Sequence, residues 1–208
     1  MVILVYRFME IIPLIHLKKR KIVTEEEEKG LSINEILEQV YKDEKIYVLD
    51  IDGIDKNKPN LCLYPKLLEN HKIWIDAGPR VLGDVVDSIM SGANKITIRQ
   101  KIWPEPDLSS IKEITECKIY VGIDSENQNM QRIEFFLLNN IDGLVIFKNK
   151  NKIETDFKYG SYLKNLCLKY KIFAYDPNPK NFSYWETLGV AGLLVDIGKT
   201  KEFKRNEY

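Results

Sequence analysis

Residues 91–98 (SGANKITI) show most plainly the sequence pattern that decides the fold. The pattern is a short connection, or joint, from the end of a helix to the start of a strand, and the chain repeats it. A helix-like stretch ends at small, turn-forming residues, two or three residues pass, and an aliphatic strand begins. The same order returns at residues 140–146 (NIDGLVI) and 188–195 (LGVAGLLV). These joints precede the fourth, sixth and eighth apolar runs of the chain, so we expect equivalent quarter-units of one closed structure.

Short apolar runs rich in Ile and Val alternate with amphipathic stretches along the chain. Runs of this kind are typical of parallel strands buried on both faces, and they cover residues 11–17, 46–51, 73–77, 95–98, 119–123, 144–147, 172–175 and 193–195. The stretches between them carry apolar residues at helical intervals and cover residues 33–41, 61–68, 81–91, 108–114, 130–138, 157–168 and 182–188. This alternation predicts either a doubly wound open sheet or a closed eight-stranded parallel (β/α)8 barrel of the TIM type. The repeated joint favours the barrel, with trimmed loops and a truncated last helix, because 208 residues is short for that fold.

The first 17 residues are apolar and are followed by the basic run 18–21 (KKRK). A secretory signal would place its positive charge before the apolar run, and Arg7 and Glu10 interrupt the run that a membrane span would need. We therefore expect residues 11–17 to form a buried strand and residues 1–8 to be a peripheral extension or a misassigned start before Met9. Residues 9–208 then form one barrel domain, and residues 18–21 belong to a solvated first βα loop, with a partner-binding arm as the alternative.

Composition restricts the partners and the compartment. The 31 basic and 31 acidic residues cancel, so no net field draws the chain to nucleic acid or to an anionic membrane. Cys62, Cys117 and Cys167 show no C-x-x-C spacing, which argues against a disulfide framework and a zinc site. We expect a cytoplasmic protein with reduced thiols and without a metal cofactor.

In barrels of this kind the C-terminal strand ends carry function. The residues at which the eight apolar runs stop are all ionisable: His16, Asp50, Asp76, Arg99, Asp124, Lys148, Asp176 and Asp196. Asp52, Arg80 and Lys101 stand just beyond. Asp is depleted within strands and common in turns, so part of this pattern could arise simply because strands end in polar residues near the surface. We nevertheless expect a polar, partly buried end of the barrel in which facing charges perturb one another's pKa values.

At these residues the chain resembles the ProFAR isomerase family of histidine biosynthesis. Residues 10–17 (EIIPLIHL) resemble the family's first strand, I-I-P-A-x-D-L, and residues 47–53 (YVLDIDG) its second, V-D-L-x-G. Residues 75–85 (IDAGPRVLGDV) resemble G-G-G-x-R-x-x-x-D-V, residues 91–98 resemble the A-G-A-x-x-V-V-V step, and residues 121–124 (VGID) resemble S-L-D. The five motifs follow in the family's order, from about residue 9 to residue 203.

The resemblance implies an aldose-to-ketose rearrangement by general acid–base catalysis. The two carboxylates that share this work in the family correspond here to His16 and Asp124, so an imidazole, which titrates near neutrality, replaces one carboxylate. The positions expected to bind substrate are Asp50, Asp76, Gly78, Arg80, Arg99, Gln100, Lys148 and Asp176.

The phosphate-binding loops depart from the family. Asp176, Pro177, Pro179 and Asp196 stand where the family has glycines, and proline donates no amide hydrogen while aspartate repels phosphate. We expect a small anionic substrate with at most one phosphate, bound near Arg80 and Arg99, and no turnover of ProFAR itself.

Three functions remain open at this point. The first is an isomerase or lyase-type enzyme acting on a phosphosugar or heterocycle precursor. The second is a catalytically degenerate barrel that serves as a binding or assembly subunit. The third is a divalent-metal site for Mg²⁺, built from Asp50, Asp76, Asp176 and Asp196.

Overall fold

The structure is a computed structural model, and it describes residues 9–23, 35, 40, 44–69, 71–124, 130–147, 151, 153 and 156–204. Its parallel strands are β1 (Glu10–Lys18), β3 (Lys45–Asp50), β4 (Lys72–Asp76), β5 (Lys95–Arg99), β6 (Lys118–Asp124), β7 (Gly143–Phe147), β8 (Lys171–Tyr175) and β9 (Gly192–Asp196). Each strand pairs in parallel with the next, and β1 also pairs in parallel with β9, with Glu10 opposite Gly192 and Leu14 opposite Asp196. The closed eight-stranded barrel is therefore confirmed.

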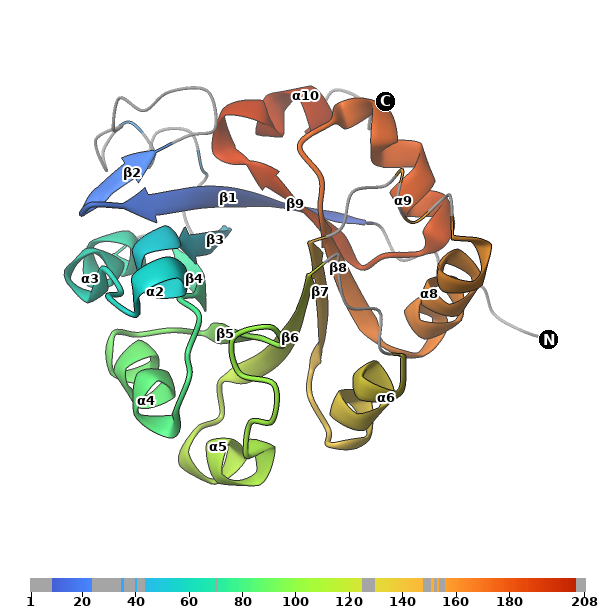
Figure 1. The fold of residues 1–208 in the computed structure, drawn as a ribbon. Coiled ribbons are helices and arrows are strands. Elements are labelled where there is room, and N and C mark those ends of the chain that lie inside the picture. The colour runs from blue at the N-terminus through green and yellow to red at the C-terminus, as the bar shows by residue number, and fades with distance from the viewer. Residues whose placement is uncertain are drawn as a thin grey trace.

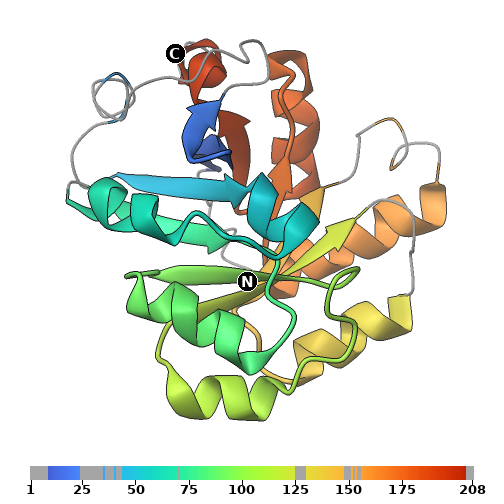
Figure 2. The ribbon, with the colours of Figure 1, turned by 60° about the vertical axis from the view of Figure 1, so that its left-hand side comes forward.

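The helices lie outside this ring of strands. They are α2 (Ile51–Lys56), α3 (Tyr64–Leu68), α4 (Leu82–Met90), α5 (Leu108–Ile114), α6 (Met130–Leu138), α8 (Phe157–Lys169), α9 (Phe182–Leu188) and α10 (Thr200–Lys204), with 3₁₀ turns η1 (Leu61–Leu63), η2 (Pro179–Asn181) and η3 (Ile197–Lys199). Figure 1 shows α3 to α6, α8 and α9 around the strands, and the turned view in Figure 2 keeps them on the outer side. The predicted helix at residues 33–41 lies outside the described residues except for 35 and 40.

The repeated joint owes its shape to one left-handed residue each time. Gly92 follows α4 with φ 91°, Asn140 follows α6 with φ 57°, and Gly189 follows α9 with φ 87°. Glycine adopts this conformation without cost and asparagine at small cost, so each helix ends there and the chain turns back into the sheet. The prediction of equivalent joints is confirmed at this level.

The loop after β1 contains a short strand that the sequence did not predict. Lys18 ends β1, Lys19 and Arg20 form a turn, and Lys21 begins a short strand, β2 (Lys21–Val23). β2 pairs antiparallel with β1, with His16 opposite Val23 (Figure 1). The basic run is exposed at the C-terminal end of β1, as expected of a solvated loop, but it forms a hairpin that the sequence did not predict.

Two apolar layers stabilise the barrel. The larger layer lies between the strands and the helices and includes Val48, Ile75, Val121 and Trp185. The smaller layer fills the barrel interior and consists of Ile12, Leu14, Tyr47, Trp74, Tyr120, Val145, Phe173 and Leu194. Because side chains alternate along a strand, membership of these layers tells which face each strand residue occupies.

Candidate functional site

Alternation divides the strand-end residues into two groups. Asp76 lies two residues after the interior Trp74, Asp196 two after Leu194, and His16 two after Leu14. Asp124 shares the interior face with Tyr120, and Arg99 shares it with Thr97, whose hydroxyl contacts two interior side chains. These five residues, the inner cluster, face the barrel interior at its C-terminal end: His16, Asp76, Arg99, Asp124 and Asp196.

Arg99 links two of these carboxylates. Its Nη2 lies 2.8 Å from Asp76 Oδ2, its Nε donates to the same oxygen at 2.9 Å, and its Nη1 donates to Asp124 Oδ1 at 2.9 Å. Burial is the largest single influence on Arg99 and opposes its charge, but Asp76, Tyr47 and Asp124 together raise the pKa of the guanidinium. The guanidinium also stacks on Phe147, with Cζ 3.7 Å from the ring centroid. Arg99 is thus a fixed, permanently charged plane.

A chain of buried hydrogen bonds connects Asp76 to the side chains of the barrel interior. The hydroxyl of Tyr47 donates to Asp76 Oδ2 at 2.7 Å and lies 3.1 Å from Thr97 Oγ1, which accepts from Trp74 Nε1 at 2.9 Å. Burial and the Asp76 charge raise the pKa of Tyr47, so the phenol stays a donor. The other oxygen, Asp76 Oδ1, is buried and accepts no hydrogen bond from the part of the chain that the structure describes. A buried acceptor of this kind is unusual outside functional or strained sites.

His16 pairs with Asp196 rather than with Asp124. Its Nδ1 lies 3.6 Å from Asp196 Oδ2, and both side chains are buried. Asp196 Oδ1 accepts from the backbone N–H of Gly198 at 3.1 Å, which fixes the carboxylate at the start of η3. His16 and Asp124 both face the interior, but they come from different strands, β1 and β6. The neighbour of His16 is the carboxylate of Asp196, whereas that of Asp124 is the guanidinium of Arg99.

Asp50 lies outside the inner cluster. It follows Val48 of the outer layer, and its carboxylate accepts from Gly53 N at 3.0 Å, Asn60 N at 2.6 Å, Asn60 Nδ2 at 2.8 Å and Tyr64 Oη at 2.6 Å. The expectation that Asp50 faces the same interior as His16 is therefore wrong. Its carboxylate instead caps α2 and joins β3 to α3.

Asp176 is the second outward carboxylate. It accepts from Trp185 Nε1 at 2.7 Å, from Asn181 Nδ2 at 2.9 Å and from Asn178 N at 2.9 Å. These contacts anchor α9 and η2 to the end of β8. Asp50 and Asp176 point away from Asp76 and Asp196, so these four carboxylates do not converge on one ion as the magnesium hypothesis required. Within the described ranges, no three His, Cys, Asp or Glu residues form a group that could hold a metal.

The remaining predicted site residues have different surroundings. Arg80 bridges two loops, since its guanidinium donates to the carbonyls of Gly53, Ile54 and Gly78 and to Asn57 Oδ1 at 2.7–3.1 Å. Gly78 is left-handed with φ 63°, and a Cβ at this position would lie 2.9 Å from both Ile54 Cα and Ile102 Cδ1. Gln100 is buried, and its backbone N–H donates to Gly122 O. Lys148 lies outside the described residues.

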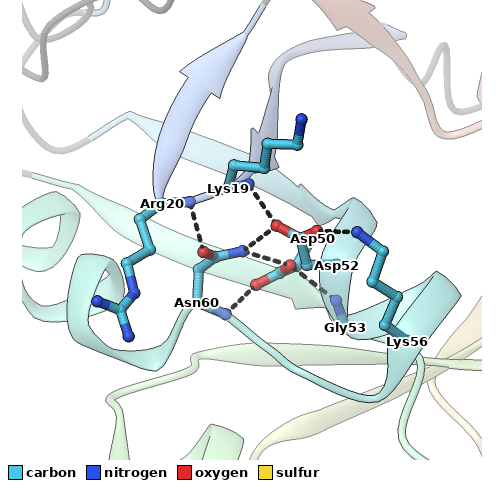
Figure 3. A network of polar contacts seen from close by, with 7 residues as sticks. All are labelled: Lys19, Arg20, Asp50, Asp52, Gly53, Lys56 and Asn60. Atoms are coloured by element: carbon cyan, nitrogen blue, oxygen red, sulfur yellow. Dashed lines mark hydrogen bonds and ion pairs between the residues drawn. The ribbon is translucent and has the colours of Figure 1, made fainter.

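A cationic pocket that the sequence did not predict lies between the β1–β2 hairpin and the segment that runs from α2 to η1. It has a volume of about 530 Å³ and is lined by Lys19, Arg20, Asp52, Lys56, Lys58, Pro59, Asn60, Leu61 and Cys62. Asp52 accepts from Lys19 N, from Lys56 Nζ at 3.2 Å and from Asn60 Nδ2 at 3.3 Å, and Arg20 N donates to Asn60 Oδ1 at 2.9 Å (Figure 3). The bond from Lys19 N is the main cause that lowers the pKa of Asp52. The signal for this pocket was the basic run at residues 18–21.

Comparisons with known proteins support the fold. No protein-family model matches the chain, and no curated protein matches its sequence. A dihydropteroate synthase of Xanthomonas albilineans, solved with indole-2-carboxylic acid and 6-chloroguanine, is similar with a TM-score of 0.66 and 10% identity, over 97% of this chain and 93% of that one. The same organism's enzyme with 7,8-dihydropteroate gives a TM-score of 0.65 and 10% identity, over 96% and 92%.

These findings define the chain as a (β/α)8 barrel protein with ionisable residues paired at the C-terminal end of the barrel. The resemblance to the ProFAR isomerase family is not shown by the comparisons, and the similarity to dihydropteroate synthases concerns the fold. No helix in the described part of the chain is long and apolar enough to cross a membrane.

Proposed function

We propose that this protein is an enzyme of the isomerase or lyase type that moves protons on a small anionic substrate, a phosphosugar or a heterocycle precursor with at most one phosphate. The observation that carries the proposal is the buried His16–Asp196 pair at the C-terminal end of the barrel. A histidine beside an oriented carboxylate is a recurrent acid–base arrangement, and its hydrogen bonds are often long before substrate binds. The fold supports an active site at this position, because enzymes with this fold have their active sites at the C-terminal end of the barrel.

In this proposal His16 is the group that takes and returns the proton. The carboxylate of Asp196 stabilises the imidazolium that forms, as an opposite charge favours the protonated ring. Gly198 N holds the carboxylate in place, so the ring orientation is set before substrate arrives. Asp196 acts through His16 and is a positioning residue.

Arg99 and Asp124 would serve substrate binding. Asp124 is the most exposed carboxylate of the inner cluster, with 29% of its side chain accessible, and Arg99 neutralises it. In such a pair the guanidinium can donate hydrogen bonds to a substrate and the carboxylate can accept one, but the paired carboxylate is not available as a base. This division assigns the proton transfer to His16 alone, where the family resemblance would divide it between His16 and Asp124.

A planar ring fits the aromatic surroundings of the cluster. Phe147 and Tyr175 lie beside each other with ring centroids 6.4 Å apart, and Phe147 already stacks on Arg99. The two similar structures were solved with planar nitrogen heterocycles, which favours the heterocycle precursor by analogy. The cationic pocket with Lys19, Arg20, Lys56 and Lys58 would take the substrate's single anionic group.

The binding test is a thermal-shift measurement on the full chain. The probes are 7,8-dihydropteroate, 6-chloroguanine, indole-2-carboxylic acid and ribose 5-phosphate, each added to the wild type and to His16→Gln. A ligand at 100 times its Kd adds ~2.7 kcal/mol of stability. We expect a shift with at least one anionic or heterocyclic probe that is reduced in His16→Gln and retained in His71→Gln, which changes the other histidine at the opposite end of the barrel.

A second candidate function, a catalytically degenerate binding or assembly subunit, is favoured by the ion pairs that occupy Asp124 and Asp76. The two functions separate when a bound probe is incubated with the protein in D₂O. The enzyme proposal predicts exchange of a carbon-bound proton that is lost in His16→Gln. Binding without any exchange would contradict the enzyme and favour the subunit.

A further inference from the structure

The N-terminal end of the barrel is lined by lysines. Five parallel strands begin with this residue: Lys45, Lys72, Lys95, Lys118 and Lys171. Lys45 is opposite Lys72 and Lys95 is opposite Lys118 in the strand register. Each stands two residues before an inward-facing side chain, so alternation directs all five toward the axis of the barrel.

Lys95 closes the interior from this side. Its Nζ lies 4.4 Å from the ring centroid of Trp74 and 5.3 Å from those of Tyr120 and Phe173. Burial and then the charge of Lys45 lower its pKa to about 8, with further repulsion from Lys118 and Lys171 and opposition from Glu10. These like charges are close enough to destabilise the protonated form of Lys95.

Two carboxylates at this end, Glu10 and Asp142, are already engaged with neighbouring groups. Glu10 Oε1 lies 2.5 Å from Lys45 Nζ and is engaged there. Asp142 accepts from the backbone N–H of Ile119 at 2.9 Å. Beside it is a pocket of about 290 Å³ that contains one carboxylate and three lysines, lined by Lys118, Tyr120, Asp142, Lys169, Tyr170 and Lys171.

We propose that this N-terminal opening binds a small polyvalent oxyanion of the phosphate type, such as pyrophosphate. Lysine ammonium groups are point charges that suit phosphate oxygens, and a multivalent anion would relieve the repulsion among Lys95, Lys118 and Lys171. The aromatic layer of Trp74, Tyr120 and Phe173 separates this site from the inner cluster. The proposal does not depend on the function proposed for the opposite end.

The test is isothermal titration of the full chain with sodium pyrophosphate at low ionic strength. We expect Lys118→Ala/Lys171→Ala to weaken binding about tenfold or more, because two of the three pocket lysines are lost. Two double variants remove the same charge elsewhere: Lys66→Ala/Lys164→Ala on exposed helix positions, and Lys56→Ala/Lys58→Ala in the cationic pocket at the C-terminal end. Both should keep the affinity of the N-terminal site within about twofold, even where Lys56→Ala/Lys58→Ala removes separate weaker binding of the anion in the cationic pocket.

Three results would overturn the proposal. The first is the absence of binding heat in the wild type. The second is an equal loss in Lys66→Ala/Lys164→Ala, which would indicate unspecific attraction. The third is a loss confined to Lys56→Ala/Lys58→Ala, which would place the anion at the C-terminal end. Because Lys118 and Lys171 are exposed, their replacement should leave the far-UV circular dichroism of the protein unchanged, and this checks the fold.

Discussion

The two ends of this barrel are built from the same strands but treat charge in opposite ways. At the C-terminal end, the buried ionisable side chains are paired: Asp76 with Arg99, and Asp196 with the imidazole of His16. At the N-terminal end, the charges that act on Lys95 are chiefly those of other lysines. The degree of burial explains the difference, since a fully buried charge must be paired whereas a partly buried ammonium group is also stabilised by water. An end with paired, fixed charges suits chemistry, and an end with unbalanced charge suits the capture of an anion.

The largest expected effect on stability follows the replacement of Arg99 at the C-terminal end. Replacement by methionine leaves Asp76 and Asp124 without their shared cation, and we expect a loss of about 3–5 kcal/mol in the free energy of unfolding. Lys95→Met makes the same kind of change at the other end but removes an ammonium group that its neighbours repel. That variant should unfold at the same or a higher urea concentration than the wild type. Equal destabilisation of the two variants would show that the ends do not differ as described.

A second variant sharpens the contrast between the inward and outward faces of one end. Asp50→Asn keeps the shape of the side chain but weakens the charge-assisted bonds from Gly53, Asn60 and Tyr64. We expect a loss of about 2 kcal/mol in urea unfolding and an unchanged affinity for any probe that binds at His16. A reduced affinity without a loss of stability would mean that Asp50 belongs to the site.

The sequence predicted the eight strands, the repeated joint and the closed barrel because these depend on local patterns of apolar and turn-forming residues. It could not tell Asp50 and Asp176 from Asp76 and Asp196. In a barrel both faces of a strand are apolar, so the strand pattern does not reveal which side is the interior. The His16–Asp196 pair depends on closure between β1 and β9, which joins residues 180 positions apart. The hairpin at Lys19 and Arg20 was missed because a basic run carries no turn signal of its own.

A smaller effect concerns pH at the N-terminal end. The pKa of Lys95 is about 8 in the folded protein, against 10.5 ordinarily, so the unfolded chain binds more protons between these values. The stability of the wild type should therefore rise relative to Lys95→Met as pH increases from about 8 to about 10.5. Urea unfolding of both proteins at several pH values checks this. A constant difference, or one that falls with pH, would contradict the lowered pKa that burial and the charges of Lys45, Lys118 and Lys171 give to Lys95.

The most direct test of the account is the environment of the His16 ring, measured by nitrogen-15 NMR of histidine-labelled protein at one fixed pH. The chain has only two histidines, so His71→Gln assigns the signals. Asp196→Asn and Asp176→Asn make the same change at the ends of neighbouring strands, one facing the interior and one facing α9. We expect Asp196→Asn to shift the ring nitrogen resonances of His16 and Asp176→Asn to leave them in place. Unchanged resonances in Asp196→Asn, or equal shifts in both variants, would contradict the His16–Asp196 pair on which the proposed chemistry rests.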